Sequence, residues 1–187
     1  MKNIKHLLLS ALIGIATPVS LTLASTAAIA ATAEDLNQSS AEALAKLYRA
    51  NPTAAAIGKQ ASAVLVFPNI IKAGLVFGAS YGEGALIKAG TTNTYYNTVS
   101  ASWGFQAGAQ SYGYVLFLMN DKALKQLEST QGWELGVGPT VVVANEGVAQ
   151  NISSTTLTGD AYAFSFNQQG LMASLSIEGS KITRIQR

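Results

Sequence analysis

Between residues 102 and 110, apolar side chains alternate one for one with glycine and glutamine, a period of two that is typical of a β-strand with one buried face. The apolar positions of this run are Trp103, Phe105, Ala107 and Ala109. Beyond Gly113 both sides are apolar, so we expect the chain there to be covered on both faces. Because the whole segment 102–119 is longer than a usual strand, we expect a turn or bulge near residues 110–113.

A second β-rich stretch precedes this one. Ala63 to Phe67 is a short apolar, β-branched and aromatic run closed by Pro68, which is typical of a buried strand. Glycine then recurs at positions 74, 78, 82 and 84. Glycine in a strand favours close backbone approach, bulges and sharp bends, so the pattern predicts a strongly curved sheet.

Helices are expected at three places. Ser39 and Glu42 form a capping-box pattern, and apolar residues follow at helical spacing as far as the stop at Asn51-Pro52. Asn51 is placed to cap a second short helix that starts at Pro52. Asn120 is placed to cap a third helix.

The C-terminal part returns to strand patterns. Residues 162–166 alternate, residues 167–170 suit a turn, and residues 171–177 alternate again, which predicts a hairpin. Gly179-Ser180 suggests one more turn into a last strand. The expected fold is α+β: a strongly curved, mainly antiparallel, glycine-rich sheet, barrel- or sandwich-like, with N-terminal amphipathic helices and one further helix.

The first thirty residues have the features of a secretory signal peptide. Lys2 and Lys5 form a basic start, Leu7 to Ile15 is apolar, and Ala28-Ile29-Ala30 suits a signal peptidase. The alternative is an uncleaved transmembrane anchor, against which Pro18 and several hydroxyl residues argue. We therefore expect cleavage near Ala30 and an exported protein of the periplasm or cell envelope.

The expected organisation is a signal peptide at 1–30, a flexible start at 31–38 and a single domain at 39–187. Losing Lys2 and Lys5 from 12 basic residues leaves 10, against 10 acidic residues. A neutral balance argues against binding nucleic acid through general electrostatics. The chain has no cysteine, so it has no disulfide, no thiolate ligand and no acceptor for an N-terminal lipid anchor.

Residues 78–82 match the G-x-S-x-G elbow of serine hydrolases, with Ser80 as the nucleophile. A serine nucleophile needs a base, and the only histidine, His6, lies in the expected signal peptide. No nucleotide-binding glycine loop or calcium loop occurs either. We expect no enzyme activity, no cofactor and no metal. The alternative is a glycosidase, because carboxylates far apart in sequence can meet in a fold.

The remaining candidate is a lipid-binding surface on the N-terminal helices. An amphipathic helix with basic groups can lie on an anionic membrane. The alternative is that the helix covers one edge of the sheet with ordinary solvated charges. The candidate lipid-binding residues are Lys46, Arg49, Lys59, Lys72, Leu44, Leu47 and Tyr48.

The run from Ala63 to Gly84 resembles the signature of the SYLF domain family. Further similar pieces are Ser102 to Gly108, Gly138-Pro139 and Tyr162 to Gly179, so the resemblance spans roughly residues 40–187. It implies binding of anionic phospholipids, phosphoinositides or phosphatidic acid, by a domain without known catalysis. In eukaryotic relatives it also implies a part in actin organisation.

The function expected on these grounds is non-enzymatic, peripheral binding of anionic phospholipid membranes in the envelope. Lys72 lies inside the matching motif, whereas Lys46, Arg49 and Lys59 are proposed from their surroundings. The alternative is a structural or interaction module that binds an envelope protein partner without lipid specificity.

Overall fold

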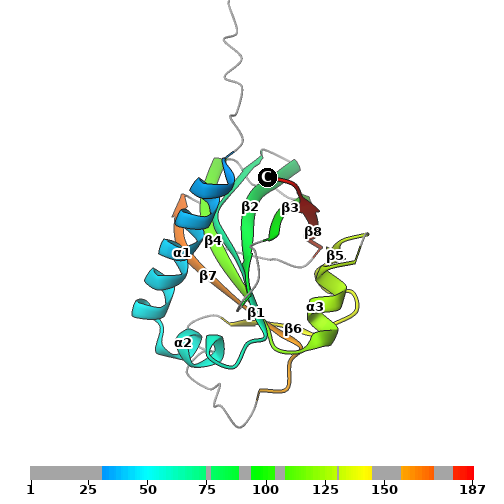
Figure 1. Cartoon of the computed structure of the whole chain (residues 1–187). Helices are drawn as coiled ribbons and strands as arrows, with labels where there is room; N and C mark the ends of the chain where they lie inside the picture. The colour runs from blue at the N-terminus through cyan, green and yellow to red at the C-terminus, as the bar shows by residue number, and fades with distance from the viewer. Residues whose placement is uncertain are drawn as a thin grey trace, which may run out of the picture. The chain divides into compact units, whose positions relative to one another are not determined.

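The computed structural model describes residues 31–74, 77–88, 94–103, 108–129, 131–144, 157–170 and 179–187. Ala31 to Arg187 form one compact unit (Figure 1). Its described elements are α1 (Ala33–Ala50), α2 (Pro52–Gly58), β1 (Ala63–Gly74), β2 (Phe77–Ile87), β3 (Thr94–Trp103), β4 (Gly108–Leu118), α3 (Asp121–Leu127), β5 (Trp133–Glu134), β6 (Val141–Ala144), β7 (Ala161–Gly170) and β8 (Lys181–Ile185).

The eight strands form one sheet in the order β5-β8-β3-β2-β1-β4-β7-β6. Its pairs are antiparallel except β6 with β7, which is parallel. The sheet curls into a half-barrel, so the expected α+β fold with a strongly curved, mainly antiparallel sheet is confirmed (Figure 1). Of the two expected forms, the barrel-like one is correct.

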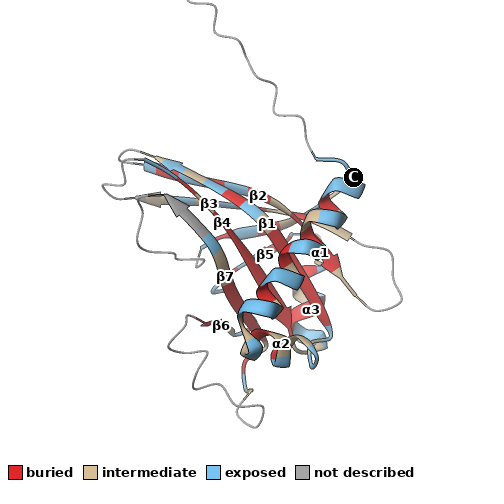
Figure 2. Cartoon of the chain, turned by 90° about the vertical axis from the view of Figure 1, so that its left-hand side faces the viewer, coloured by how far each residue is buried: buried red, intermediate tan, exposed pale blue. Residues whose placement is uncertain are grey.

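Each face of the sheet has its own core. The inner face carries Phe67 and Tyr114 and packs with α3 and with Trp133 of β5. The outer face carries Val66 and Phe117 and is covered by α1 and α2. Figure 2 shows buried strands beneath α1 and exposed strand ends beyond it, so α1 covers only part of the outer face.

The first helix begins earlier than expected, at Ala33 rather than near Ser39. Thr32 Oγ1 accepts a hydrogen bond from the Asp35 N–H at 3.1 Å, and the Asp35 carboxylate accepts one from the Thr32 N–H at 3.3 Å. This capping box, together with buried Leu36, starts the helix. The prediction of a flexible start at 31–38 is therefore wrong for residues 33–38.

The other two helices follow their predicted caps. The Asn51 side chain accepts from the Ala54 N–H at 2.9 Å and precedes Pro52 at the start of α2. The Asn120 side chain accepts from the Ala123 N–H at 3.1 Å at the start of α3. Both predicted starts are confirmed, because an asparagine cap acts through local contacts only.

The first strand does not end at Pro68, as the sequence suggested, but runs on to Gly74. The register of β1 shifts between Phe67 and Ile70 against β4, so Pro68 lies in a bulge. A proline lacks an N–H, and a bulge is a place in a sheet where that loss is tolerated.

The segment 102–119 is two strands rather than one. β3 ends at Trp103 and β4 begins at Gly108, and β1 and β2 lie between them in the sheet. The break therefore comes before residues 110–113, where we expected it. A register shift between Ser111 and Gly113 against β7 is the irregularity found in that stretch.

At the C-terminus, β7 runs through the expected turn as far as Gly170, with Asn167 at a positive φ of 53°. The expected return strand at 171–177 lies outside the described residues. Gly179 has a φ of +73° and leads into β8, so the expected last strand is confirmed.

Candidate functional site

The apolar candidate residues of the first helix belong to the core. Leu47 is 4% exposed, and Leu44 and Tyr48 pack against the outer-face cluster. The Tyr48 ring stacks on Phe117 with 6.2 Å between centroids, and burial raises the pKa of its hydroxyl. These side chains are therefore occupied in holding α1 on the sheet.

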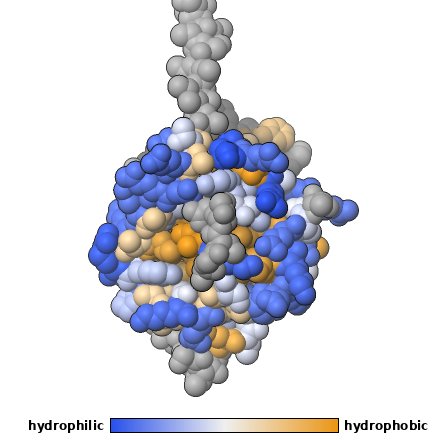
Figure 3. All heavy atoms as spheres, viewed as in Figure 1, coloured by the Kyte–Doolittle hydropathy of each residue, from blue (hydrophilic) through white to orange (hydrophobic). Residues whose placement is uncertain are grey.

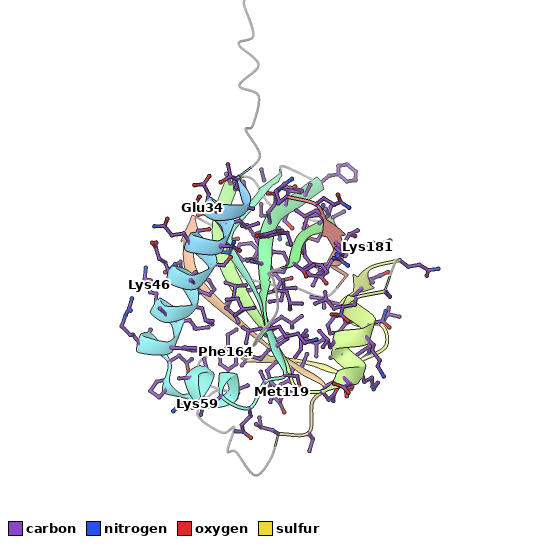
Figure 4. The ribbon with its side chains drawn as sticks, in the orientation of Figure 1. Glu34, Lys46, Lys59, Met119, Phe164 and Lys181 are labelled. Atoms are coloured by element: carbon purple, nitrogen blue, oxygen red, sulfur yellow. The ribbon has the colours of Figure 1, made fainter. Side chains whose placement is uncertain are left out.

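Three of the basic candidates, Lys46, Arg49 and Lys59, are exposed near the junction of α1 and α2. Figure 4 shows Lys46 pointing away from the sheet, and Lys59 lower in the view, at the end of α2. Neither ion pair found in the described part of the chain involves them. We call these three exposed side chains, on the second half of α1 and at the end of α2, the basic group.

Lys72 is separate from that group. Lys72 lies in register with Gln110 of β4. It is nine residues from Ala63, the first residue of β1 after α2, and nine residues of extended strand span about 30 Å. The bulge places Lys72 on the inner face with Phe67, opposite the face that α1 covers. The structure thus places three of the four basic candidates on α1 and α2 and the fourth on the opposite face of the sheet.

A surface that sequence reasoning missed lies on the outer face beyond α1. We call Ile71, Phe77, Tyr81 and Val99 the outer patch; they are 57%, 61%, 49% and 45% exposed. Ile71 lies opposite Tyr81, and Tyr81 lies opposite Val99, so three of them adjoin across β1, β2 and β3. The exposed strand ends are visible in Figure 2.

The surroundings of the outer patch carry small side chains and few charges. The next register row holds exposed Ala73, Ala79 and Ala101. Lys181 of β8 lies opposite Val99 and is exposed. No acidic partner of Lys181 is found within the described ranges.

Glu83, on the other side of the patch, is already paired. Its carboxylate accepts hydrogen bonds from Arg187 and from the Tyr81 hydroxyl. Burial alone would raise the pKa of Glu83, but these bonds and the Arg187 charge outweigh burial and lower it. Glu83 is therefore neutralised, and the other rim charge, Lys181, lies opposite exposed Glu134 of β5 without an ion pair among the described residues.

The inner face carries a polar row near the same strand ends. We call Ser100, Ser80, Lys72 and Gln110, which lie opposite one another across β3, β2, β1 and β4, the inner polar row. The Oγ atoms of Ser80 and Ser100 are 2.6 Å apart. Ser80 thus lies inside a strand, paired with another serine, and not on the strand-to-helix turn of a hydrolase.

Polar and apolar surfaces are clearly separated on the side seen in Figure 3. Hydrophilic residues gather over α1 and over α3, and hydrophobic residues lie between them. Where the structure describes the chain, no cluster of three or more acidic or histidine side chains could hold a metal ion. No described helix is long and apolar enough to cross a membrane.

Comparison with protein families matches residues 99–187 to the family described as Ysc84, Las17-binding protein actin regulator. No curated protein matches the chain. The matched range runs from Val99 in β3 to the end of β8 and includes α3. Its strands pair with β1 and β2, which carry the motif at residues 63–84, so both belong to one sheet. Residues 99–187 of the chain are therefore similar to the Ysc84 family, which supports the SYLF resemblance of residues 63–84.

Proposed function

We propose that this chain is a non-enzymatic module that binds anionic phospholipid membranes in the cell envelope, with the outer patch as its apolar contact. The observation that carries the proposal is the exposure of Ile71, Phe77, Tyr81 and Val99 on one face of the sheet. Contiguous exposed apolar side chains of this kind mark membrane or protein contact sites. The similarity of residues 99–187 to a family of binding domains supports the same interpretation.

The size of the patch suits reversible attachment. Burying the exposed half of each of the four side chains would contribute about 1 kcal/mol apiece, or about 4 kcal/mol together. Lys181 at the rim would add about 1 kcal/mol at an anionic surface. A total of about 5 kcal/mol corresponds to a dissociation constant somewhat below 1 mM, which is weak binding that a second contact would strengthen.

The basic group Lys46, Arg49 and Lys59 is the second contact that we propose. Each charge near an anionic surface contributes about 1 kcal/mol and is screened over about 8 Å at physiological ionic strength. The basic group should therefore act through charge alone and weaken as salt rises. The outer patch should act mainly through apolar burial and respond less to salt.

Flotation with vesicles separates the two contacts. The protein should float with phosphatidylglycerol or phosphatidic acid vesicles and not with phosphatidylcholine alone. The combined variant Ile71→Ser, Phe77→Ser and Val99→Ser should lose binding at low and high salt alike. The matched control is Val137→Ser, because Val137 is 60% exposed but lies in the loop after β5.

The combined variant Lys46→Glu, Arg49→Glu and Lys59→Glu should bind more weakly than the unaltered protein at low salt, and the difference should shrink as salt rises, because screening removes the contribution of the basic group. If the unaltered protein stays at the bottom of the gradient with every lipid mixture, the proposal is wrong. The chain would then be a protein-interaction module, with the outer patch as its contact.

Envelope localisation is part of the proposal and rests on the sequence of residues 1–30. We expect the mature chain to begin close to Ala31. N-terminal sequencing of protein recovered from the periplasm measures this directly. An intact chain starting at Met1 in the membrane fraction would show an uncleaved anchor instead.

A further inference from the structure

We propose that the inner polar row is a binding site for a phosphate ester that carries a hydroxyl group. The first observation is Gln110, whose side chain is 3% exposed while neither its Nε2 nor its Oε1 has a hydrogen-bond partner. Buried amides in native proteins are nearly always paired. A fully buried, unpaired amide therefore marks a place where another molecule can supply the missing bonds.

The second observation is the ammonium group beside this amide. Lys72 lies directly opposite Gln110 on β4 and opposite Ser80 on β2. Side chains opposite one another in an antiparallel pair have Cβ atoms about 4.5–5.5 Å apart, so the three share one small region. Lys72 is half-buried and forms neither of the ion pairs found among the described residues. Its charge is available to a ligand.

Hydroxyl groups complete the set of donors. In the Ser80–Ser100 pair one hydroxyl donates to the other, which leaves one hydrogen free to donate to a third group. Tyr112 is two residues from Gln110 on the same face of β4. Burial raises the pKa of Tyr112, although a hydrogen bond with Ser80 works in the opposite direction, so its hydroxyl is protonated at neutral pH.

Among the described residues the row is open on its β4 side only. The next positions on the same face are Ser102, Gly78, Gly74 and Gly108, which lie in register, but Gly78 is buried and a Cβ atom at Gly74 would lie 2.5 Å from Gly78 Cα. A Cβ atom at Gly108 would meet nothing within 4 Å. A ligand can therefore approach Gln110 from the β4 side, past Gly108.

The donors and acceptors define the ligand. One ammonium group, one amide NH₂ and the hydroxyls favour a group with a negative charge and several acceptor oxygens, and lysine is a common phosphate ligand. The Gln110 Oε1 can only accept, so the ligand must also donate a hydrogen. A phosphate ester with a neighbouring hydroxyl meets both needs. Such an ester could be a free metabolite such as glycerol phosphate or the head group of a glycerophospholipid. The lipid source rests on the function proposed above.

The test is titration of the ¹⁵N-labelled protein with glycerol 1-phosphate and, separately, with dihexanoyl phosphatidylglycerol below its micelle concentration. Both should shift the side-chain amide resonances of Gln110. Lys72→Met and Gln110→Leu should each weaken binding at least about tenfold, the effect of one lost charge-assisted hydrogen bond. Lys125→Met removes an exposed lysine from α3, outside both proposed contacts, and should leave binding unchanged.

The thermal midpoint distinguishes a binding role from a structural one. Gln110→Leu removes an unpaired buried amide, so the variant should be at least as stable as the unaltered protein while binding less. Binding of either probe without any shift at Gln110, or equal affinity of the Lys72→Met variant, would overturn the proposal, as would no binding of either probe. Binding of glycerol 1-phosphate but not of the lipid would assign the site to a free phosphate ester. The outer patch is judged separately, by flotation.

Discussion

Asp160 joins three separate parts of the chain through its carboxylate. Oδ2 accepts from Lys122 Nζ at 2.7 Å and from the Thr140 N–H at 2.8 Å, and Oδ1 accepts from Asn120 Nδ2 at 2.8 Å. It therefore ties the start of α3 and the start of β6 to the start of β7. The Lys122 hydrogen bond, with help from Asn120 and Thr140, lowers the pKa of Asp160 from 3.8 to about 2.

A carboxyl whose pKa falls on folding stabilises the fold above its unfolded pKa, and that contribution is lost as the pH falls through the folded pKa. The contribution of Asp160 should therefore be complete above about pH 4 and disappear towards pH 2. Asp160→Asn should lower the thermal midpoint at neutral pH and flatten the acid dependence in that window. The control Asp121→Asn, one residue after the Asn120 cap, should keep the acid dependence, and equal curves for both variants would contradict this account.

Gly84 is a position where the fold leaves no room for a side chain. A Cβ atom there would lie 2.3 Å from the Val66 carbonyl oxygen and 2.8 Å from the Phe67 ring. Gly84→Ala should therefore lower the free energy of unfolding by about 1–3 kcal/mol, as overpacking does elsewhere. Urea denaturation measures this, with Ala79→Ser on the exposed side of the same strand as the control. A neutral Gly84→Ala would show that β1 and β2 are less closely packed than described.

At the scale of elements, the apolar side of α1 packs on the sheet, so we expect it to contribute to stability and not to membrane contact. Its Leu47 side chain is 4% exposed against the sheet. Leu47→Ala should cost about 2–5 kcal/mol of unfolding free energy, in line with other buried leucines. Ala45→Ser, on the exposed side of the same helix, should be close to neutral. If Leu47→Ala instead left stability intact and abolished vesicle binding, the helix would be a membrane contact after all.

The elements that the sequence predicts well are those set by local chemistry. Asn51-Pro52 and Asn120 start helices through contacts within three residues, and the β7 and β8 strands follow plain alternation or a glycine turn. The first half of β3 and the parallel strand β6 were not predicted. Their partners, β8 and β7, are supplied by the rest of the chain and cannot be read from short stretches.

The candidate site was harder to predict because of the bulge at Pro68. Simple alternation would place Ile71 on the same face as Phe67 and Lys72 on the other. The extra residue reverses this, so that Lys72 joins the inner face and Ile71 the exposed outer face. One register shift thus moved the predicted cation away from the helices and created the outer patch.

At the scale of the whole molecule, the last strand is an interior part of the sheet. β8 lies between β3 and β5 and contributes Ile182, which is fully buried with Trp133. Deleting residues 181–187 should therefore abolish cooperative unfolding, observed by near-UV circular dichroism during heating. Arg187→Gln removes only the ion pair with Glu83 and should leave a cooperative transition. A folded truncated protein would show that β8 is dispensable.

The position of β8 also sets when the protein can fold. During synthesis β1 and β2 emerge early, but the pairing of Tyr95 with Ile185 cannot form until β8 has emerged from the ribosome. Sheets that depend on such distant pairings fold slowly, because a long loop must close before its contacts form. A chain whose sheet is incomplete until β8 has been made stays unfolded for longer during synthesis. That delay would keep it competent for passage through a translocation channel, which the predicted signal peptide requires.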